Sequence, residues 1–537
     1  MYPAKSRLAD GGIQEPGVRT QKEVSALTLT GIITSSLFYR RLSCLCQAFL
    51  KYWAESYARQ KICTLPLYSS PQLVGESLIL SAVSRLLNLL LRPMAAFGLF
   101  LRRVVPGSVL LNLNLPAVVS QSKTLGAIAG IRVESALWMV IFYPVADYMI
   151  RKIPALGFLS GSWDELLLLF IITAWPVQMA LSGKITYRYS GLDMPILIFT
   201  GITLFLFFMR SGNTGLAAEG FRVYLEYLLW FFIGSNLILN RRQFDALTKG
   251  IVLVAVLVSV VGVYQYVAGV ETPAQWVDQA EAGIKTRVFS IVVSPNVLGS
   301  LLIIFIPVTM GRLLTSADRI NQSLYLGALH LMFACMVFTY SRGAWLALAG
   351  SMAVLSLMHN PRLLLLMGAG SLAAAQMAPG IGARLTYMFS PAYLASSEKA
   401  GRIALWQKGL DKFLQDPLFG SGFGTYGGAV AARKIPGSVY TDNFYLKTAV
   451  ESGLIGLLAL LWLLACTFRC GYTAYRKIAD SSLKVMAAAI LAGLIGVALH
   501  NSVENIFEVP MMTTYFWFLS GVLVSLPHLE DSIEKTP

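Results

Sequence analysis

Three arginines lie next to apolar segments, at positions where few cations are expected. Arg287 is followed by the turn Ser294-Pro295-Asn296, Arg342 lies between two apolar runs, and Arg402 opens an amphipathic segment. Charged groups at membrane depth are costly and tend to mark functional sites. The planar guanidinium can bind phosphate or carboxylate through paired hydrogen bonds. The alternative for each arginine is that it only reaches out to lipid headgroups.

Asp442 is the carboxylate immediately before a long apolar segment. A carboxylate at this place could accept a proton from an acceptor hydroxyl. The alternative is structural, because Asp is a favoured N-cap and a helix is predicted to begin near Asn443. Both interpretations remain open from the sequence.

Two other pairs of polar residues have helical spacing. Lys447 and Glu451 are four residues apart, which predicts an ion pair on one helix. His500 and Glu504 have the same spacing, but two residues do not make a metal site, so no metal is predicted. The glycine-rich run Gly420–Gly424 is a weak signal for a phosphate loop, because no strand precedes it and no Lys-Ser/Thr follows.

The elements that carry these residues are apolar helices. The chain is 56% hydrophobic and only 13% charged, with a mean hydropathy of +0.63. Apolar runs of about 20 residues match the thickness of a bilayer core. We therefore predict an all-α polytopic membrane protein with about 12 transmembrane helices. The spans are expected near 135–150, 164–182, 193–210, 222–239, 247–269, 288–310, 324–341, 343–358, 363–378, 443–467, 484–504 and 510–527.

Lys and Arg are more frequent in alternate connections, which predicts that both termini are cytoplasmic. This orientation makes 379–442 a large extracytoplasmic loop. The loop is too long for a simple connector, and its aromatic content argues for a folded lid. The other divisions are a basic N-terminal cytoplasmic or interfacial extension at 1–130, a transmembrane domain at 131–528 and a cytoplasmic tail at 529–537. The net charge of +15 is explained by this orientation, so no nucleic-acid partner is predicted.

Several segments resemble, in the expected order, the O-antigen ligase/polymerase superfamily of membrane glycosyltransferases. They cover roughly residues 135 to 525. The segments are Leu192-Asp193-Met194-Pro195, Phe221-Arg222-Val223-Tyr224, Arg287 with Ser294-Pro295-Asn296, Ser341-Arg342-Gly343-Ala344-Trp345, Gly401-Arg402 with Trp406, Asp416-Pro417-Leu418-Phe419-Gly420-Ser421-Gly422, Asp442-Asn443-Phe444-Tyr445-Leu446 and Glu451-Ser452-Gly453-Leu454-Ile455-Gly456.

The resemblance implies a GT-C-like fold in the bacterial inner membrane. It also implies transfer of a glycan from undecaprenyl pyrophosphate to an acceptor hydroxyl at the outer face. Arg287, Arg342 and Arg402 are then expected to hold the pyrophosphate, and Asp442 to act on the acceptor. Guanidinium groups can stabilise the charge that grows on the departing pyrophosphate, so neither a metal ion nor another cofactor is required. The expected partners are the lipid-linked glycan, membrane lipids and other polysaccharide-assembly proteins.

The sequence departs from the ligase pattern at one place. Ligases that transfer to the lipid A core carry a His-Asn pair in the outer loop, whereas this chain has Asp442-Asn443. We therefore favour a polymerase of O-antigen, exopolysaccharide or capsule over a ligase. The alternative class is a transporter or flippase of a lipid-linked sugar or small anion, similar to bicarbonate transporters, in which Asp147 and Glu226 could relay protons. A third alternative is a structural scaffold for polysaccharide assembly.

Overall fold

Long apolar helices build the part of the chain that the computed structural model describes. This part comprises residues 133–182, 187–210, 212–273, 286–292, 294–362, 390–391, 397–398 and 401–531, and it contains no strand, only an isolated bridge between Gly427 and Tyr440. All of it lies within one unit, Leu113–Pro537. The predicted basic extension at 1–130 and the span at 363–378 lie outside the described residues.

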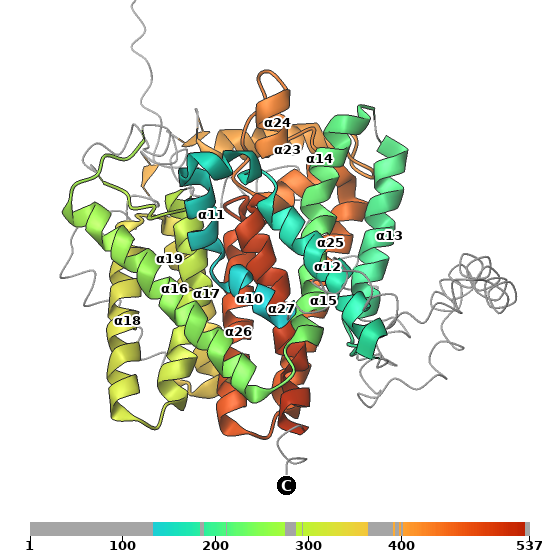
Figure 1. Cartoon of the computed structure of the whole chain (residues 1–537). Helices are drawn as coiled ribbons and strands as arrows, with labels where there is room; N and C mark the ends of the chain where they lie inside the picture. Colours follow the sequence, from blue (N-terminus) through green and yellow to red (C-terminus); the bar gives the residue numbers. More distant parts are fainter. Residues whose placement is uncertain are drawn as a thin grey trace, which may run out of the picture. The chain divides into compact units, whose positions relative to one another are not determined.

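The helices follow one another as up-and-down elements (Figure 1). Those of the first half are α10 (Val133–Ile141), α11 (Tyr143–Lys152), η2 (Pro154–Leu159), α12 (Trp163–Ser182), α13 (Asp193–Arg210), α14 (Thr214–Leu225), η3 (Glu226–Leu228), α15 (Leu229–Leu237) and α16 (Arg241–Val267). Those of the second half are α17 (Pro295–Thr315), α18 (Arg319–Phe338), α19 (Arg342–His359), α23 (Arg402–Gln415), α24 (Ala429–Lys434), α25 (Phe444–Lys477), α26 (Ser481–His500), η5 (Ile506–Glu508) and α27 (Pro510–Asp531).

Six of these helices are long and apolar enough to cross a membrane, which confirms the predicted class of all-α polytopic membrane protein. They are α13, α16, α17, α18, α25 and α26. Two predicted spans are divided in the structure. The span at 135–150 is split into α10 and α11, where Pro144 enters the first turn of α11. The span at 222–239 is split into the end of α14, η3 and α15.

Helices α17 and α26 form the centre of this unit. Each is apolar around its circumference, and 78% of its most apolar stretch is buried. A helix that is apolar on every side is stable only where other helices surround it. Glycines let the two helices approach closely, since a Cβ on Gly493 would lie 3.1 Å from the Cα of Ile304. Helix α26 also packs against α19, α25 and α27.

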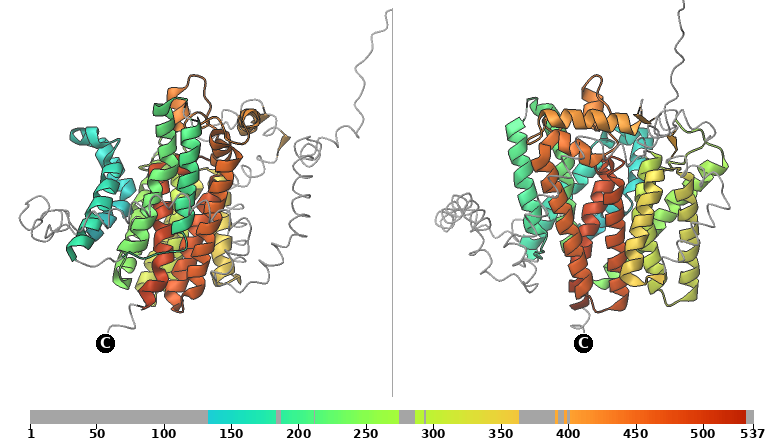
Figure 2. Two further views of the ribbon diagram at one scale, coloured as in Figure 1. Left: turned by 90° about the vertical axis from the view of Figure 1, so that its right-hand side faces the viewer. Right: turned by 180° about the vertical axis from the view of Figure 1, so that it is seen from behind.

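Helices α23 and α24 lie at one end of the helices, here called the loop end, and α27 ends at the opposite end (Figures 1 and 2). Helix α23 packs on α25. The contact is close at Gly409, where a Cβ would lie 2.8 Å from Cδ2 of Leu446. The sequence predicts that Leu414 shares the apolar face of α23, but this side chain is 54% exposed.

Helix α25 is broken at Gly453, and the glycine-rich turn fills the break. Gly453 has φ 66° and ψ −170°. The freed backbone groups are satisfied by the preceding loop: the amides of Ser421 and Gly422 donate to the carbonyls of Val450 and Glu451 at 2.8 and 2.9 Å. The Gly420–Gly424 run therefore closes the helix break, and the weak phosphate-loop interpretation is unnecessary.

Replacement of Gly453 by alanine is expected to destabilise the protein. The positive φ alone costs about 1–3 kcal/mol for a residue with a side chain, and a Cβ would collide with the carbonyl oxygen of Leu418. We expect a lower thermal unfolding midpoint in detergent. Gly327→Ala is the matched control, because nothing lies within 4 Å of a Cβ there. An equal loss in both variants would contradict this account of the break.

Candidate active site

Arg402 joins two carboxylates that are distant in the sequence. It is the first residue of α23. Its Nη2 lies 2.5 Å from Oε1 of Glu504, and its Nε lies 3.5 Å from Oδ2 of Asp442. Glu504 is buried, at 7% exposure, whereas the Asp442 side chain is 31% exposed. The structure thus brings together two of the predicted residues and adds one that was not predicted.

Arg287 reaches the same carboxylate through an asparagine. The amide nitrogen of Asn296, in the first turn of α17, donates to Oε1 of Glu504. Nη2 of Arg287 donates to the amide oxygen of Asn296 at 3.3 Å. Arg287 and Arg402 therefore converge on Glu504 from segments more than a hundred residues apart.

Arg342 begins α19 directly beside this cluster. The Nε of Arg287 donates to the carbonyl of Thr339 at 3.1 Å, in the turn that precedes Arg342. The next residue, Gly343, packs on the end of α26, where its Cβ position is 3.2 Å from Nε2 of His500. The segments that carry the three arginines therefore meet around residues 500–505.

Backbone strain is concentrated near the same residues. Among the described residues, the non-glycine residues with positive φ are Ser290, Tyr340 and Asp442. Each is one of the predicted site residues or lies within three positions of one. Such backbone conformations persist only where surrounding contacts impose them, and they cluster at functional sites. For Ser290 the contacts come from Gln265, whose Oε1 accepts from the Ser290 amide at 2.7 Å and whose Nε2 donates to its carbonyl at 2.9 Å.

The capping interpretation of Asp442 is wrong. The N-cap of α25 is Asn443, whose side chain accepts from the Leu446 amide at 3.0 Å. Asp442 lies one residue earlier with φ 47°, so its carboxylate faces Arg402 instead of the helix. The preceding carbonyl, that of Thr441, accepts from the indole of Trp406 on α23 at 3.1 Å. These contacts fix Asp442 at the loop end.

Electrostatics distinguish the two carboxylates from ordinary surface acids. Burial raises the pKa of Glu504, Arg402 opposes the rise and the neighbouring Asp442 adds to it, and the resulting pKa is about 8. Burial also raises the pKa of Asp442, again against the effect of Arg402. Both groups lie in connections outside the candidate membrane spans. Two carboxylates that share one guanidinium favour a state in which one of them holds a proton.

A second buried polar cluster anchors the loop to the helices. Nζ of Lys447 lies 2.6 Å from Oε2 of Glu451, which confirms the predicted ion pair, and 3.4 Å from Oε1 of Glu508. Nζ also donates to the hydroxyl of Tyr224 at 3.2 Å. Glu508 in turn accepts from the hydroxyl of Tyr440 at 3.2 Å. This cluster holds the chain two residues before Asp442, so its role is to position the loop.

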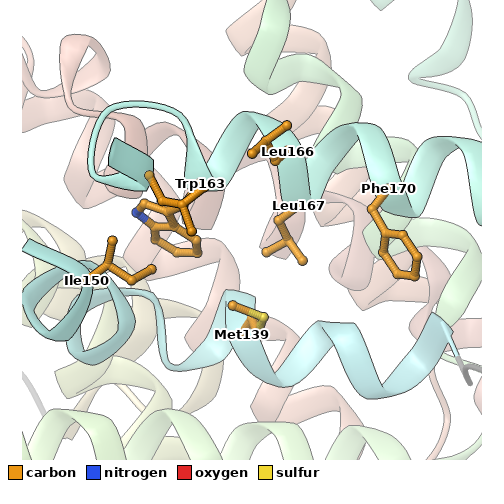
Figure 3. A pocket seen from close by; sticks show the side chains of 7 residues that line it. Met139, Ile150, Trp163, Leu166, Leu167 and Phe170 are labelled. Carbon is orange, nitrogen blue, oxygen red and sulfur yellow. The ribbon is translucent and has the colours of Figure 1, made fainter. Parts of the chain in front are cut away.

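The acids considered for a proton relay have structural partners. Asp147 pairs with Arg151 at 2.8 Å, and Glu226 pairs with Arg222 at 3.3 Å. A cavity of about 320 Å³ lies nearby between α10, α11 and α12 (Figure 3). It has no charged side chain in its lining and therefore does not fit a pyrophosphate. The lining residues are Met139, Ile150, Leu159, Trp163, Leu166, Leu167 and Phe170.

Sequence reasoning missed Glu504 and Asn296. Glu504 was noted only for its spacing from His500, and Asn296 only as part of a turn. An acid inside an otherwise apolar segment is itself a signal for a functional site, and Glu504 ends the predicted span 484–504. In the described part of the chain, no group of three or more His, Cys, Asp or Glu residues could hold a metal ion.

Comparison with known families identifies this region. The family model described as O-Antigen ligase matches residues 327–461. The match covers the segments that carry Arg342, Arg402 and Asp442, together with the broken first part of α25. This region is thus similar to O-antigen ligase, which confirms the predicted resemblance to the O-antigen ligase superfamily. A search of curated proteins found no match to this chain.

Proposed function

We propose that this protein is a glycosyltransferase that polymerises or transfers undecaprenyl-pyrophosphate-linked oligosaccharide at the outer face of the bacterial inner membrane. The O-antigen ligase domain and the membrane helices make it a membrane enzyme of polysaccharide assembly. The proposal for the chemistry rests mainly on the convergence of Arg287 and Arg402 on Glu504 beside Asp442. In this proposal the fold is GT-C-like, the loop end faces outward and both termini are cytoplasmic.

The arginines supply what the departing group requires. As the glycosidic bond to pyrophosphate breaks, negative charge accumulates on the phosphate oxygens. Guanidinium groups that are already fixed stabilise this charge without reorganising. Arg402 is held by Glu504 and Asp442, and Arg287 by Asn296 and the Thr339 carbonyl. Arg342, at the start of α19, is proposed as the third ligand of the pyrophosphate.

Asp442 is proposed to accept the proton of the acceptor hydroxyl. It is more exposed than Glu504, so an incoming sugar can reach it. Its raised pKa brings it closer to the working pH, where a general base is most effective. The proton passes to Asp442 while the new glycosidic bond forms and the pyrophosphate leaves.

Replacement of Asp442 by asparagine should lower kcat by about 10²–10⁴-fold, because the amide cannot accept the proton. The KM for the donor should change little, since the arginines remain. Both values are obtained from initial rates with a synthetic lipid-linked oligosaccharide. Asp411→Asn is the control, because Asp411 is exposed on α23. If the Asp442→Asn variant kept the wild-type kcat, Asp442 would not be the general base.

Products distinguish a polymerase from a ligase. We favour a polymerase because Asp442-Asn443 stands where lipid A core ligases carry His-Asn. Purified protein in nanodiscs, given only the lipid-linked oligosaccharide, should then give a ladder of lengthening products. Products that form only after a foreign lipid or protein acceptor is added would indicate a ligase instead.

A transporter or flippase is the alternative class. Its strongest support is the break in α25, because discontinuous helices bind substrates in many transporters. In this chain, however, the freed backbone groups at Gly453 are bonded to the loop at Pro417–Gly422. Asp147 and Glu226 are likewise held in ion pairs. These contacts favour an enzyme.

A further inference from the structure

We propose that ionised Glu504 is an internal anion that pairs with the arginines of the site, and that pyrophosphate binding is coupled to proton uptake by Glu504. This inference rests on the proposed function and extends it to a residue outside the predicted site. It makes donor binding depend on pH through one identified carboxylate.

The geometry gives Glu504 a central place in the cluster. A single oxygen, Oε1, accepts from Nη2 of Arg402 at 2.5 Å and from the amide of Asn296. Asn296 in turn accepts from Arg287. One buried carboxylate therefore holds one arginine directly and orients the other through an amide. This is the contact that a phosphate oxygen would make with the same donors.

Charged and titratable groups from several segments of the chain lie near Glu504. Arg402 comes from α23, Arg287 from the segment 286–292 and Asp442 from the residue before the cap of α25. His500 lies four residues earlier, at the end of α26, and also faces Arg402. The Tyr440 hydroxyl contributes a further weak acid near Glu504. Of these, Glu504 and Asp442 are the two carboxylic acids, and they share the guanidinium of Arg402.

The direction of the pH effect follows from this arrangement. Burial already raises the pKa of Glu504 to about 8. A bound pyrophosphate adds negative charge beside Glu504 and competes for Arg402, and both effects raise the pKa further. Glu504 is therefore protonated when pyrophosphate binds. Above a pH of about 8 this proton must come from solvent, so the affinity should fall by up to about tenfold per pH unit.

The first test measures proton uptake with inorganic pyrophosphate. The full chain in nanodiscs is titrated by calorimetry near pH 8 in two buffers that differ in ionisation enthalpy. The wild type should take up more protons per bound pyrophosphate than Glu504→Gln, by up to about one. Glu504→Gln should also bind more tightly at high pH, because its amide oxygen still accepts from Arg402 and Asn296 but carries no charge. A merely structural role predicts weaker binding.

Two variants serve as controls. Glu226→Gln removes another partly buried acid, which pairs with Arg222 instead of the site. It should leave the proton uptake unchanged. Asp442→Asn tests the neighbouring carboxylate. If Asp442→Asn abolishes the uptake and Glu504→Gln does not, Glu504 is not the proton acceptor and the inference is overturned.

A second measurement does not depend on any variant. The donor KM of the wild type should rise as the pH is raised through about 8, whereas a constant KM would overturn the inference.

The outcomes distinguish this inference from the proposed function. If pyrophosphate binds but its proton uptake does not depend on Glu504, the inference is overturned and the proposed function is unaffected. Coupled binding without any glycosyl transfer supports the inference and contradicts the proposed function. Failure of pyrophosphate to bind at any pH contradicts both.

Discussion

Arg402→Lys is expected to slow release of undecaprenyl pyrophosphate by about 10²–10³-fold, the usual loss when one fixed donor to a developing oxyanion is removed. Arg402 uses Nη2 and Nε on two different carboxylates at the same time. Lysine keeps the positive charge, but a single ammonium group cannot reproduce this fork. The measurement is the initial rate of release by purified protein at saturating donor.

Arg433→Lys is the matched control for this substitution. Arg433 lies on α24 at the loop end, is 68% exposed and pairs weakly with Glu219 at 3.8 Å. We expect its rate to stay within about twofold of wild type, because exposed ion pairs contribute little. Full activity of a folded Arg402→Lys protein would contradict the pyrophosphate-binding role of Arg402.

Lys447→Met is expected to cost about 3–5 kcal/mol of stability, the usual loss when one partner of a buried ion pair is removed. The substitution leaves the buried carboxylates of Glu451 and Glu508 without their shared cation. We expect little folded protein and a strongly lowered unfolding midpoint. The midpoint is measured in detergent by tryptophan fluorescence. The double variant Lys447→Met/Glu451→Gln should recover part of the loss, because it removes one of the stranded charges.

Lys434→Met is the control for this prediction. Lys434 is 55% exposed on α24 and pairs with Glu219 at 3.1 Å. Its replacement should change stability by less than about 1 kcal/mol. If Lys447→Met unfolded at the same temperature as Lys434→Met, the buried cluster would not anchor the loop as the structure indicates.

Much of the fold could be predicted because the membrane fixes helix length. Hydropathy located α13, α16, α17, α18 and α26 to within about seven residues at each end, but it ended the span of α25 ten residues too early, at 467 instead of Lys477. It did not locate the breaks at Phe142 and Gly453. Both depend on local events, a proline at the start of α11 and a loop that bonds to the opened helix. Hydropathy alone cannot predict either helix break.

The site could be predicted only in part. Arginine chemistry and family resemblance identified Arg287, Arg342, Arg402 and Asp442. The partner that links two of these arginines, Glu504, is 102 residues from Arg402 and 208 from Asn296. Such pairing is produced by the packing of α17 on α26 and of α23 on α25, and a local sequence pattern cannot predict it. The N-cap was misplaced by one residue, because both Asp and Asn are good caps and only the backbone conformation distinguishes them.

The most direct test of the enzymatic assignment is a single-turnover experiment in proteoliposomes. Purified protein receives a lipid-linked oligosaccharide labelled in both the sugar and the lipid, and the separation of the two labels is followed in time. We predict that free undecaprenyl pyrophosphate appears in step with an extended glycan, and that this separation is lost in Arg402→Ala. Saturable movement of the intact donor across the membrane, with both labels still joined, would contradict the account and establish a transporter.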